Sequence, residues 1–276
     1  MYSPPNENLI WSVHRFRTTF IDPIGNARVG TGTGFWVSDM NGGRHFVTNK
    51  HNVDARLKFG SETQLKLHTA EIELRRIESG VPLPDKNFFN VSNLECLVIS
   101  KTSDCAVLID PNLHEHDPTK FIITDITKFK DLATSQEFES YNIKVMESAV
   151  FIGYPGAQGK YWSDESFGLP IARQCSIASW PGISFTHQDI PTTDTMLVSG
   201  LSFSGSSGSP VFALSRGIRP GGDISDPTWR PARLIGVMSG HFLESEGIPA
   251  MFAHTGLSYL TRSTSVIKLF EEAGIW

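Results

Sequence analysis

The chain has 276 residues, of which 39% are hydrophobic and 19% charged, and its formal net charge is −5. This length allows one large domain or two modest ones, with a core that needs no disulfide or metal. The composition excludes a disordered tail and a charge-dense coil. The mildly acidic balance argues against nucleic-acid binding, because phosphate recognition depends on basic surfaces.

The N-terminus and the cysteines predict a soluble, cytoplasmic protein. Residues 1–7 lack the basic and apolar regions of a signal peptide. No apolar run approaches the roughly 18–20 residues that a membrane helix needs, so no membrane contact is expected. The cysteines are Cys96, Cys105 and Cys175, which form no C-x-x-C pair. We therefore expect a reducing compartment and no metal site.

Short β-like runs dominate the chain in order. The first two, 33–38 and 45–48, flank Asn41-Gly42-Gly43, and an Asn-Gly turn between β-prone runs is typical of a hairpin. Further strands are expected at 94–100, 106–109, 148–153, 174–178, 195–198, 210–213, 234–238 and 250–253. Because strands do not alternate with helices, the pattern predicts an all-β fold and argues against a doubly wound sheet.

Two helices are expected. One covers about 127–132, and the clearer one is the C-terminal segment, where Ser263 or Thr264 can cap the helix and Gly274 ends it. Irregular stretches are predicted at 61–90 and 215–230 as surface excursions, and at 117–141 as a link between two β modules.

The sharpest local signal is the segment 205–211, which reads GSSGSPV. A hydroxyl flanked by small residues and followed by an apolar strand is exposed at a tight turn, where backbone N–H groups can converge on one point. A serine hydroxyl is a weak nucleophile until a base takes its proton. That base is typically a histidine, which needs a partner to fix its tautomer.

Two upstream segments supply these partners. His51 follows an apolar strand, and Asp104 directly precedes another. The order is His…Asp…Ser, with Ser207 as the nucleophile. His45 is the nearest competitor of His51, but it opens the strand that His51 follows. Asp54 and Asp110 are alternatives to Asp104, but neither precedes an apolar strand.

These motifs resemble those of chymotrypsin/trypsin-fold serine proteases, in the disulfide-free bacterial branch. The segment 48–51 matches Thr-x-x-His, 104–108 matches Asp-x-Ala-Val-Leu, and 205–210 matches Gly-x-Ser-Gly-Ser-Pro. The resemblance implies two packed antiparallel six-stranded β-barrels with a C-terminal α-helix against the second. It divides the chain into a first barrel at 1–120, a linker at 121–143, a second barrel at 144–262 and the helix at 263–276.

The resemblance also implies catalytic roles and a serine endopeptidase activity. Ser207 would attack the scissile carbonyl, His51 would act as general base and then general acid, and Asp104 would orient His51. The backbone N–H groups of Gly205 and Ser207 would form the oxyanion hole. No metal or cofactor is required, and the expected partner is a protein or peptide substrate.

The resemblance places four residues at the substrate. They are Leu201 at the base of the primary specificity pocket, Ser239 and Gly240 on the strand that pairs with a bound peptide, and His241 at the pocket rim. An acidic residue at position 201 would select Lys or Arg in the substrate. Because this position holds leucine, we expect a small or apolar residue before the scissile bond.

One departure from the family bears on control. Secreted members carry an aspartate directly before the nucleophile, which receives a new N-terminal amine on activation, whereas this chain has Ser206. That route is therefore not expected. We expect control either by narrow specificity or by an activating protein partner, in a bacterial stress or defence pathway.

Three other interpretations compete. The first is a catalytically silent relative that serves as a peptide-binding or interaction module. The second is an α/β-hydrolase with the order Ser207, Asp223 or Asp226, then His241 or His254; against it, Ser209 replaces the second glycine of G-x-S-x-G. The third reads the segment 114–117, HEHD, as a metal site, although a solvated loop is the better interpretation.

Overall fold

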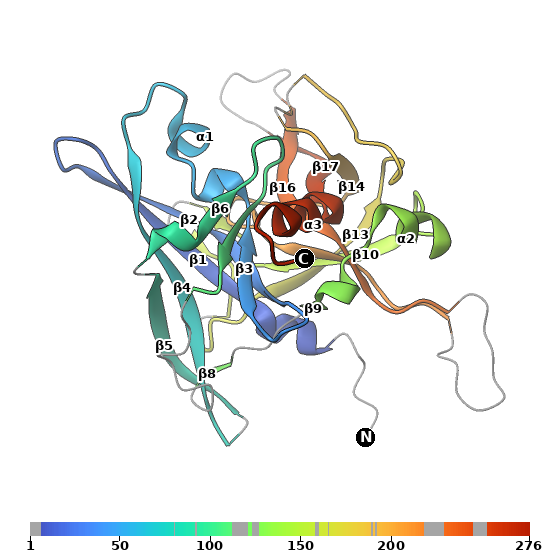
Figure 1. Ribbon diagram of the computed structural model, residues 1–276, viewed down its shortest axis with the longest axis horizontal. Helices are drawn as coiled ribbons and strands as arrows, with labels where there is room; N and C mark the ends of the chain where they lie inside the picture. The colour runs from blue at the N-terminus through green and yellow to red at the C-terminus, as the bar shows by residue number, and fades with distance from the viewer. Residues whose placement is uncertain are drawn as a thin grey trace.

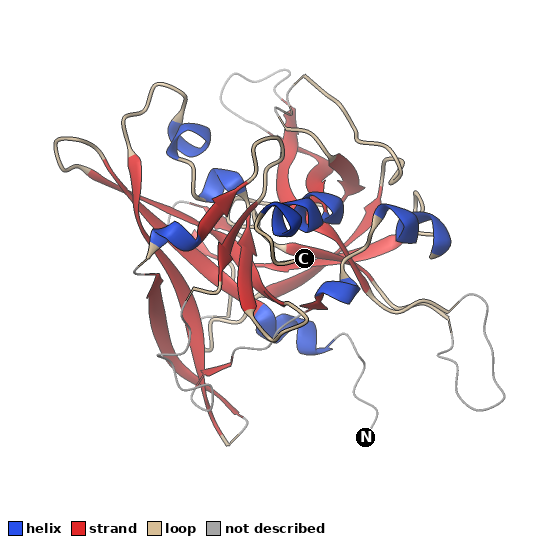
Figure 2. Cartoon of the chain, viewed as in Figure 1, coloured by secondary structure: helices blue, strands red, loops and turns tan. Residues whose placement is uncertain are grey.

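The computed structural model describes residues 7–79, 81–91, 93–111, 121–122, 127–157, 160–164, 166–188, 190, 192–217, 229–244 and 253–276. Two antiparallel β modules make up most of the fold, and helix α3 (Ser263–Glu272) lies between them (Figures 1 and 2). None of the helices described is long and apolar enough to cross a membrane.

The first module is a nine-stranded sheet. Its main path runs β5-β4-β1-β2-β3-β7-β6, while β8 pairs with β4 and β9 with β2. The strands are β1 (Val13–Ile21), β2 (Ala27–Ser38), β3 (Arg44–Thr48), β4 (Lys66–Glu78), β5 (Val81–Val91), β6 (Leu97–Ile99), β7 (Ala106–Ile109), β8 (Phe121–Ile122) and β9 (Thr127–Lys128). Among the described residues no pairing joins β5 to β6, so this module differs from the closed six-stranded barrel expected.

The second module is a closed barrel of six antiparallel strands in the order β10-β13-β14-β17-β16-β15, as predicted. The strands are β10 (Ser148–Gly153), β13 (Ile171–Ile177), β14 (Thr195–Ser199), β15 (Pro210–Ala213), β16 (Arg233–Glu244) and β17 (Ala253–Arg262). A two-stranded sheet of β11 (Gly156–Ala157) and β12 (Lys160–Tyr161) follows β10.

The surface excursion expected at 61–90 is wrong, because β4 and β5 pair there as a long antiparallel hairpin. Ile72 and Leu74 face one side and are buried, but Glu73 and Arg75 on the other side are buried as well. Arg75 forms an ion pair with Glu73, and Arg15 Nη1 lies 3.0 Å from Glu73 Oε2. Residues 70–75 alternate apolar and charged side chains, which is the pattern of a strand, so the sequence did carry a signal for β4.

The helices differ in detail from expectation. The segment 127–132 holds β9 and a 3-10 turn at Phe129–Asp131, and the mid-chain α-helix is α2 (Ser135–Ser140). A capping box between Thr134 and Glu137 begins α2. At α3, the Ser263 hydroxyl does not cap the helix but donates to the Ala133 carbonyl at 2.5 Å.

Further short elements are the 3-10 turns η1 (Glu7–Ser12), η2 (Lys50–Asn52) and η3 (Leu94–Cys96), and the helix α1 (Ala55–Phe59). The predicted turn at 41–43 joins β2 to β3. Three expected segments lie wholly or partly outside the described residues. They are most of the excursion at 215–230, the strand at 250–253 except its last residue, and 117–120 of the linker. The proposed domain boundaries stay a prediction.

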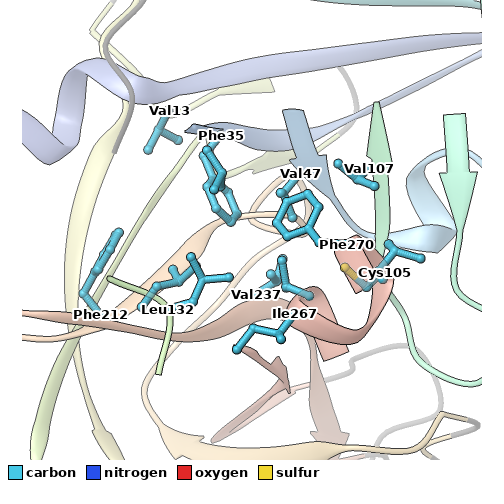
Figure 3. Close-up of a cluster of buried hydrophobic side chains, with 14 of the residues drawn as sticks. Val13, Phe35, Val47, Cys105, Val107, Leu132, Phe212, Val237, Ile267 and Phe270 are labelled. Carbon is cyan, nitrogen blue, oxygen red and sulfur yellow. The ribbon is translucent and has the colours of Figure 1, made fainter. Parts of the chain in front are cut away.

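A buried apolar cluster joins the two modules (Figure 3). It comprises Val13, Phe35, Val47, Cys105 and Val107 from the first module, Phe212 and Val237 from the second, Leu132 between them, and Ile267 and Phe270 from α3. Helix α3 therefore packs on both modules rather than on the second alone. The predicted all-β, chymotrypsin-like fold, with two packed antiparallel sheets and a C-terminal helix, is confirmed.

Candidate active site

His51 and Asp104 lie side by side because β3 and β7 are neighbours. Thr48 at the end of β3 pairs with Ala106 at the start of β7, so the residues just beyond them meet. His51 Nδ1 lies 2.8 Å from Asp104 Oδ2, and the His51 backbone N–H donates to Oδ1 at 3.0 Å. This bond uses Nδ1 of the ring and leaves Nε2 for proton transfer.

The charge of Asp104 is well stabilised. Its side chain is only 8% exposed. Burial raises the pKa of Asp104, but the charge of His51 and hydrogen bonds from His51 and Ser239 together outweigh it, so the pKa lies below its ordinary value. At neutral pH the group is a carboxylate, which can stabilise an imidazolium beside it.

The competing residues lie elsewhere. His45 Nε2 is 3.3 Å from Asp39 Oδ2, so its carboxylate neighbour is not Asp104. Asp54 caps the N-terminus of α1. The backbone N–H of Asp110 donates to His45 Nδ1 at 3.4 Å. None of these contacts involves His51 or its aspartate.

Ser207 lies on the loop between β14 and β15, and this loop is docked on β2. Gly205 and Gly208 have φ angles of 85° and 93°, a region that favours glycine. A Cβ on Gly208 would lie 1.8 Å from the carbonyl oxygen of Thr33. Thr33 N–H donates to the Ser207 carbonyl at 2.8 Å, and its hydroxyl donates to the Gly205 carbonyl at 2.8 Å. Backbone contact between the modules thus sets the position of Ser207.

Asn52 and Lys58 add a second brace that the sequence interpretation missed. Asn52 Nδ2 donates to the Ser207 carbonyl at 3.1 Å and to Thr48 Oγ1 at 3.0 Å. Lys58 Nζ donates to Asn52 Oδ1 at 3.2 Å. Burial lowers the pKa of Lys58 to about 8, although the charge of Asp104 opposes this shift.

The Ser207 hydroxyl donates to the Ser239 carbonyl at 3.3 Å. Within the described part of the chain it forms no hydrogen bond with His51. The N–H groups of Gly205 and Ser207 also have no partner there, and they are the two donors expected for an oxyanion hole. Ser206 closes the turn, because its N–H donates to the Phe203 carbonyl at 2.9 Å and its Oγ accepts from Phe203 N–H at 3.3 Å.

Ser239 connects the two modules behind His51 and Asp104. Its hydroxyl accepts a hydrogen bond from Asn49 Nδ2 at 3.1 Å and lies 2.9 Å from Thr261 Oγ1. Asn49 Nδ2 also donates to the Asp104 carbonyl at 2.8 Å. Among the described strands, β16 pairs with β15 only as far as Val237, so its edge is open beside Ser239.

The other three residues expected at the substrate have distinct surroundings. Leu201 is 45% exposed. At Gly240 a Cβ would lie 2.5 Å from the Tyr259 hydroxyl, so only glycine fits without displacement. The ring of His241 stacks on that of His254, with centroids 4.5 Å apart.

In the described ranges no group of three or more His, Cys, Asp or Glu side chains could hold a metal ion. The segment 114–117 lies outside those ranges, as do Asp223 and Asp226. The three cysteines are free, and burial raises the pKa of Cys175 to about 12.

Comparison with models of known protein families finds no match, and comparison with curated proteins finds none. Among solved structures, the chain is similar to Deg5, with 15% identity and a TM-score of 0.48. The likeness covers 96% of this chain and 89% of that one. A likeness this distant does not assign a chemistry to the site.

Proposed function

We propose that this chain is a serine endopeptidase that hydrolyses peptide bonds through an acyl-enzyme. The observation that supports it best is the double contact of His51 with Asp104, at 2.8 Å and 3.0 Å. Ser207 stands on a turn that is held against the same module, and two N–H groups of this turn have no partner among the residues described. Together these provide a base, its orienting carboxylate, a nucleophile and oxyanion donors.

The proposed reaction begins when Ser207 Oγ attacks the scissile carbonyl carbon and its proton passes to His51 Nε2. The oxyanion accepts hydrogen bonds from the N–H groups of Gly205 and Ser207. His51 then protonates the leaving amine, and the acyl-enzyme remains. Water attacks the ester with His51 as base, the acid product leaves, and the serine hydroxyl is restored.

The test is labelling by a fluorophosphonate probe, which forms a covalent bond with an activated serine. We expect the wild type to be labelled, and Ser207→Ala and His51→Ala to lose labelling. Ser209→Ala is a matched control, since it removes a buried hydroxyl two residues from the nucleophile. An unlabelled wild type, or labelling that survives in Ser207→Ala, would contradict the proposal.

A second candidate is favoured by the bond between Ser207 and the Ser239 carbonyl. In this conformation the Ser207 hydroxyl donates to Ser239 and, among the described residues, not to His51, as expected of a peptide-binding module or of an enzyme that awaits a protein partner. An enzyme awaiting its partner would be labelled weakly alone and strongly with the partner. Robust casein digestion by the isolated chain would exclude both alternatives. The cytoplasmic location and the bacterial stress or defence role stay predictions.

A further inference from the structure

Five partly or fully buried side chains form what we call the basic cluster. They are Ser202 and Phe203 on the nucleophile loop, Arg173 on β13, His241 on β16 and His254 on β17. The two histidine rings stack at 4.5 Å with an interplanar angle of 20°. Ser202 Oγ lies 3.4 Å from His241 Nδ1, and Ser202 N–H donates to His254 Nε2 at 3.2 Å.

Arg173 is the charge in this cluster. Its guanidinium carbon lies 4.6 Å from the centre of the Phe203 ring, and the His254 ring lies 6.0 Å from that same ring. Among the residues described, no carboxylate pairs with Arg173. By contrast, the buried Arg230 and Arg233 pair with Glu147 and Glu137.

A partly buried cation without a counter-ion is costly, because the low local dielectric penalises an uncompensated charge. Burial lowers the pKa of Arg173, yet arginine remains protonated in proteins. The cluster itself contains no acidic side chain. A bound anionic ligand would therefore be stabilised by the uncompensated charge of Arg173.

The two histidines contribute no charge to the cluster. Burial lowers the pKa of His241, and the neighbouring His254 lowers it further. Burial also lowers the pKa of His254; the hydrogen bond with Ser202 opposes this shift, and the charge of Arg173 adds to it. Both rings are therefore neutral near pH 7. Both ring nitrogens of His254 face backbone N–H groups, Nε2 that of Ser202 at 3.2 Å and Nδ1 that of Gly256 at 2.8 Å, so His241 is the ring that can donate to a ligand.

The cluster lies where a substrate residue next to the scissile bond would reach. The attacked carbonyl must come within roughly 3–3.5 Å of Ser207 Oγ. Ser202 and Phe203 precede Ser207 on the same loop. His241 follows Ser239 by two residues, and the Ser239 carbonyl is already in contact with the Ser207 hydroxyl.

We propose that the basic cluster binds a carboxylate side chain, so that the enzyme cleaves after glutamate or aspartate. Arg173 supplies the charge, Ser202 and His241 supply hydrogen bonds, and His254 holds the His241 ring by stacking on it. This inference rests on the proposed peptidase function. It replaces the expectation of a small or apolar residue, which was based on Leu201 alone.

The first test uses peptides that differ only at the residue before the scissile bond: Glu, Asp, Gln, Ala or Phe. Gln matches Glu in shape, so their comparison isolates the charge. We expect kcat/KM to be at least about tenfold higher for Glu than for Gln, as for a charge-assisted hydrogen bond. Equal or higher values for Gln, Ala or Phe would overturn the inference.

Variants assign the preference to Arg173. Arg173→Gln should remove the advantage of Glu over Gln, mainly through KM, and Arg173→Lys should restore part of it. Arg28→Gln is the matched control, because Arg28 makes a similar contact at 5.7 Å with Phe59 in the first module. If Arg173→Gln does not fold, the kcat/KM values of the wild type for the Glu and Gln peptides still test whether the site prefers a carboxylate.

A second measurement separates this inference from the proposed function. Fluorophosphonate labelling reports on Ser207 alone, so a labelled wild type without a preference for acidic residues overturns the inference only. Calorimetry on Ser207→Ala compares peptides that end in Glu or Gln. Tighter binding of the Glu peptide supports the cluster even without turnover, and equal binding contradicts it. An acidic preference at another substrate position overturns the assignment.

Discussion

The side-chain amide of Asn52 donates a hydrogen bond to the backbone carbonyl of Ser207 at 3.1 Å. Asn52 directly follows His51, so the segment that carries the base is bonded to the loop that carries the nucleophile. Asn52 fits a tight slot, because a Cβ on Gly32 would lie 2.5 Å from its Nδ2. The relative position of base and nucleophile therefore depends on this contact as well as on the packing of the modules.

Asn52→Ala should reduce the rate of fluorophosphonate labelling by about tenfold, since one of two donors to the Ser207 carbonyl is lost. It should also lower the free energy of unfolding by about 1–3 kcal/mol, because buried partners lose their hydrogen bonds. Asn26→Ala, at an exposed turn, is the control and should change neither quantity. Unchanged labelling in Asn52→Ala would show that Thr33 alone holds the loop.

Gly208→Ala tests the close approach of the nucleophile loop to β2. The new Cβ would lie 1.8 Å from the Thr33 carbonyl oxygen, so the loop must shift. We expect labelling to fall by at least about 100-fold, as a shift of the nucleophile disrupts the attack geometry. Gly25→Ala is the matched control. The φ of Gly25 is 92°, close to that of Gly208, and no atom lies within 4 Å of the position that an added Cβ would take.

Both variants place alanine in the same strained backbone region, which costs roughly 1–2 kcal/mol. Only Gly208→Ala adds the clash. For each variant we compare the free energy of unfolding, from urea titration, with the rate of labelling. Similar losses of labelling in both variants would mean that the contact with Thr33 does not position Ser207.

The sequence was sufficient to predict the catalytic candidates because each of their signals is local. His51 directly follows a strand and Asp104 precedes one, and strand pairing brings such positions together. The nucleophile loop is also local, since small residues and glycines with positive φ determine its shape. The short apolar runs predicted strands, whereas the closed second barrel was expected only from the family resemblance.

The rest depends on contacts between distant segments. The alternation at 70–75 could have revealed β4, but the burial of Glu73 and Arg75 as an ion pair depends on the fold. The basic cluster gathers side chains from four segments, and no spacing in the sequence connects Arg173 with His241 or His254. The observation that marks the cluster is electrostatic: Arg173 has no carboxylate partner among the described residues. This can be recognised only once the fold is known.

Asp104→Asn tests the orientation of His51. The amide is similar in shape but carries no charge, and it favours the wrong tautomer of the ring. We expect labelling and peptide hydrolysis near pH 7 to fall by about 10³–10⁴-fold. Asp110→Asn, at the other end of β7, is the control and should retain activity. A loss below about tenfold in Asp104→Asn would argue against a triad.

His14 should make the fold less stable in mild acid. The ring is buried, its Nδ1 lies 3.0 Å from the Glu73 carbonyl, and its Nε2 has no partner among the described residues. Burial lowers the pKa of His14 to about 4, and the charge of Arg75 lowers it further. The unfolded chain, with an ordinary histidine pKa of about 6.5, binds more protons than the folded chain between these values.

Stability should therefore fall as the pH drops through this range, by about 2 kcal/mol between pH 7 and pH 5 from this residue. Asp104 adds its own loss only at lower pH, as its depressed pKa is approached. Urea unfolding at pH 7 and pH 5 measures the difference, which His14→Gln should reduce by about this amount; His241 and His254, whose pKa values are also lowered, contribute the remainder. The exposed His68→Gln should retain it. Equal pH dependence in the wild type and His14→Gln would show that His14 is not the group that titrates.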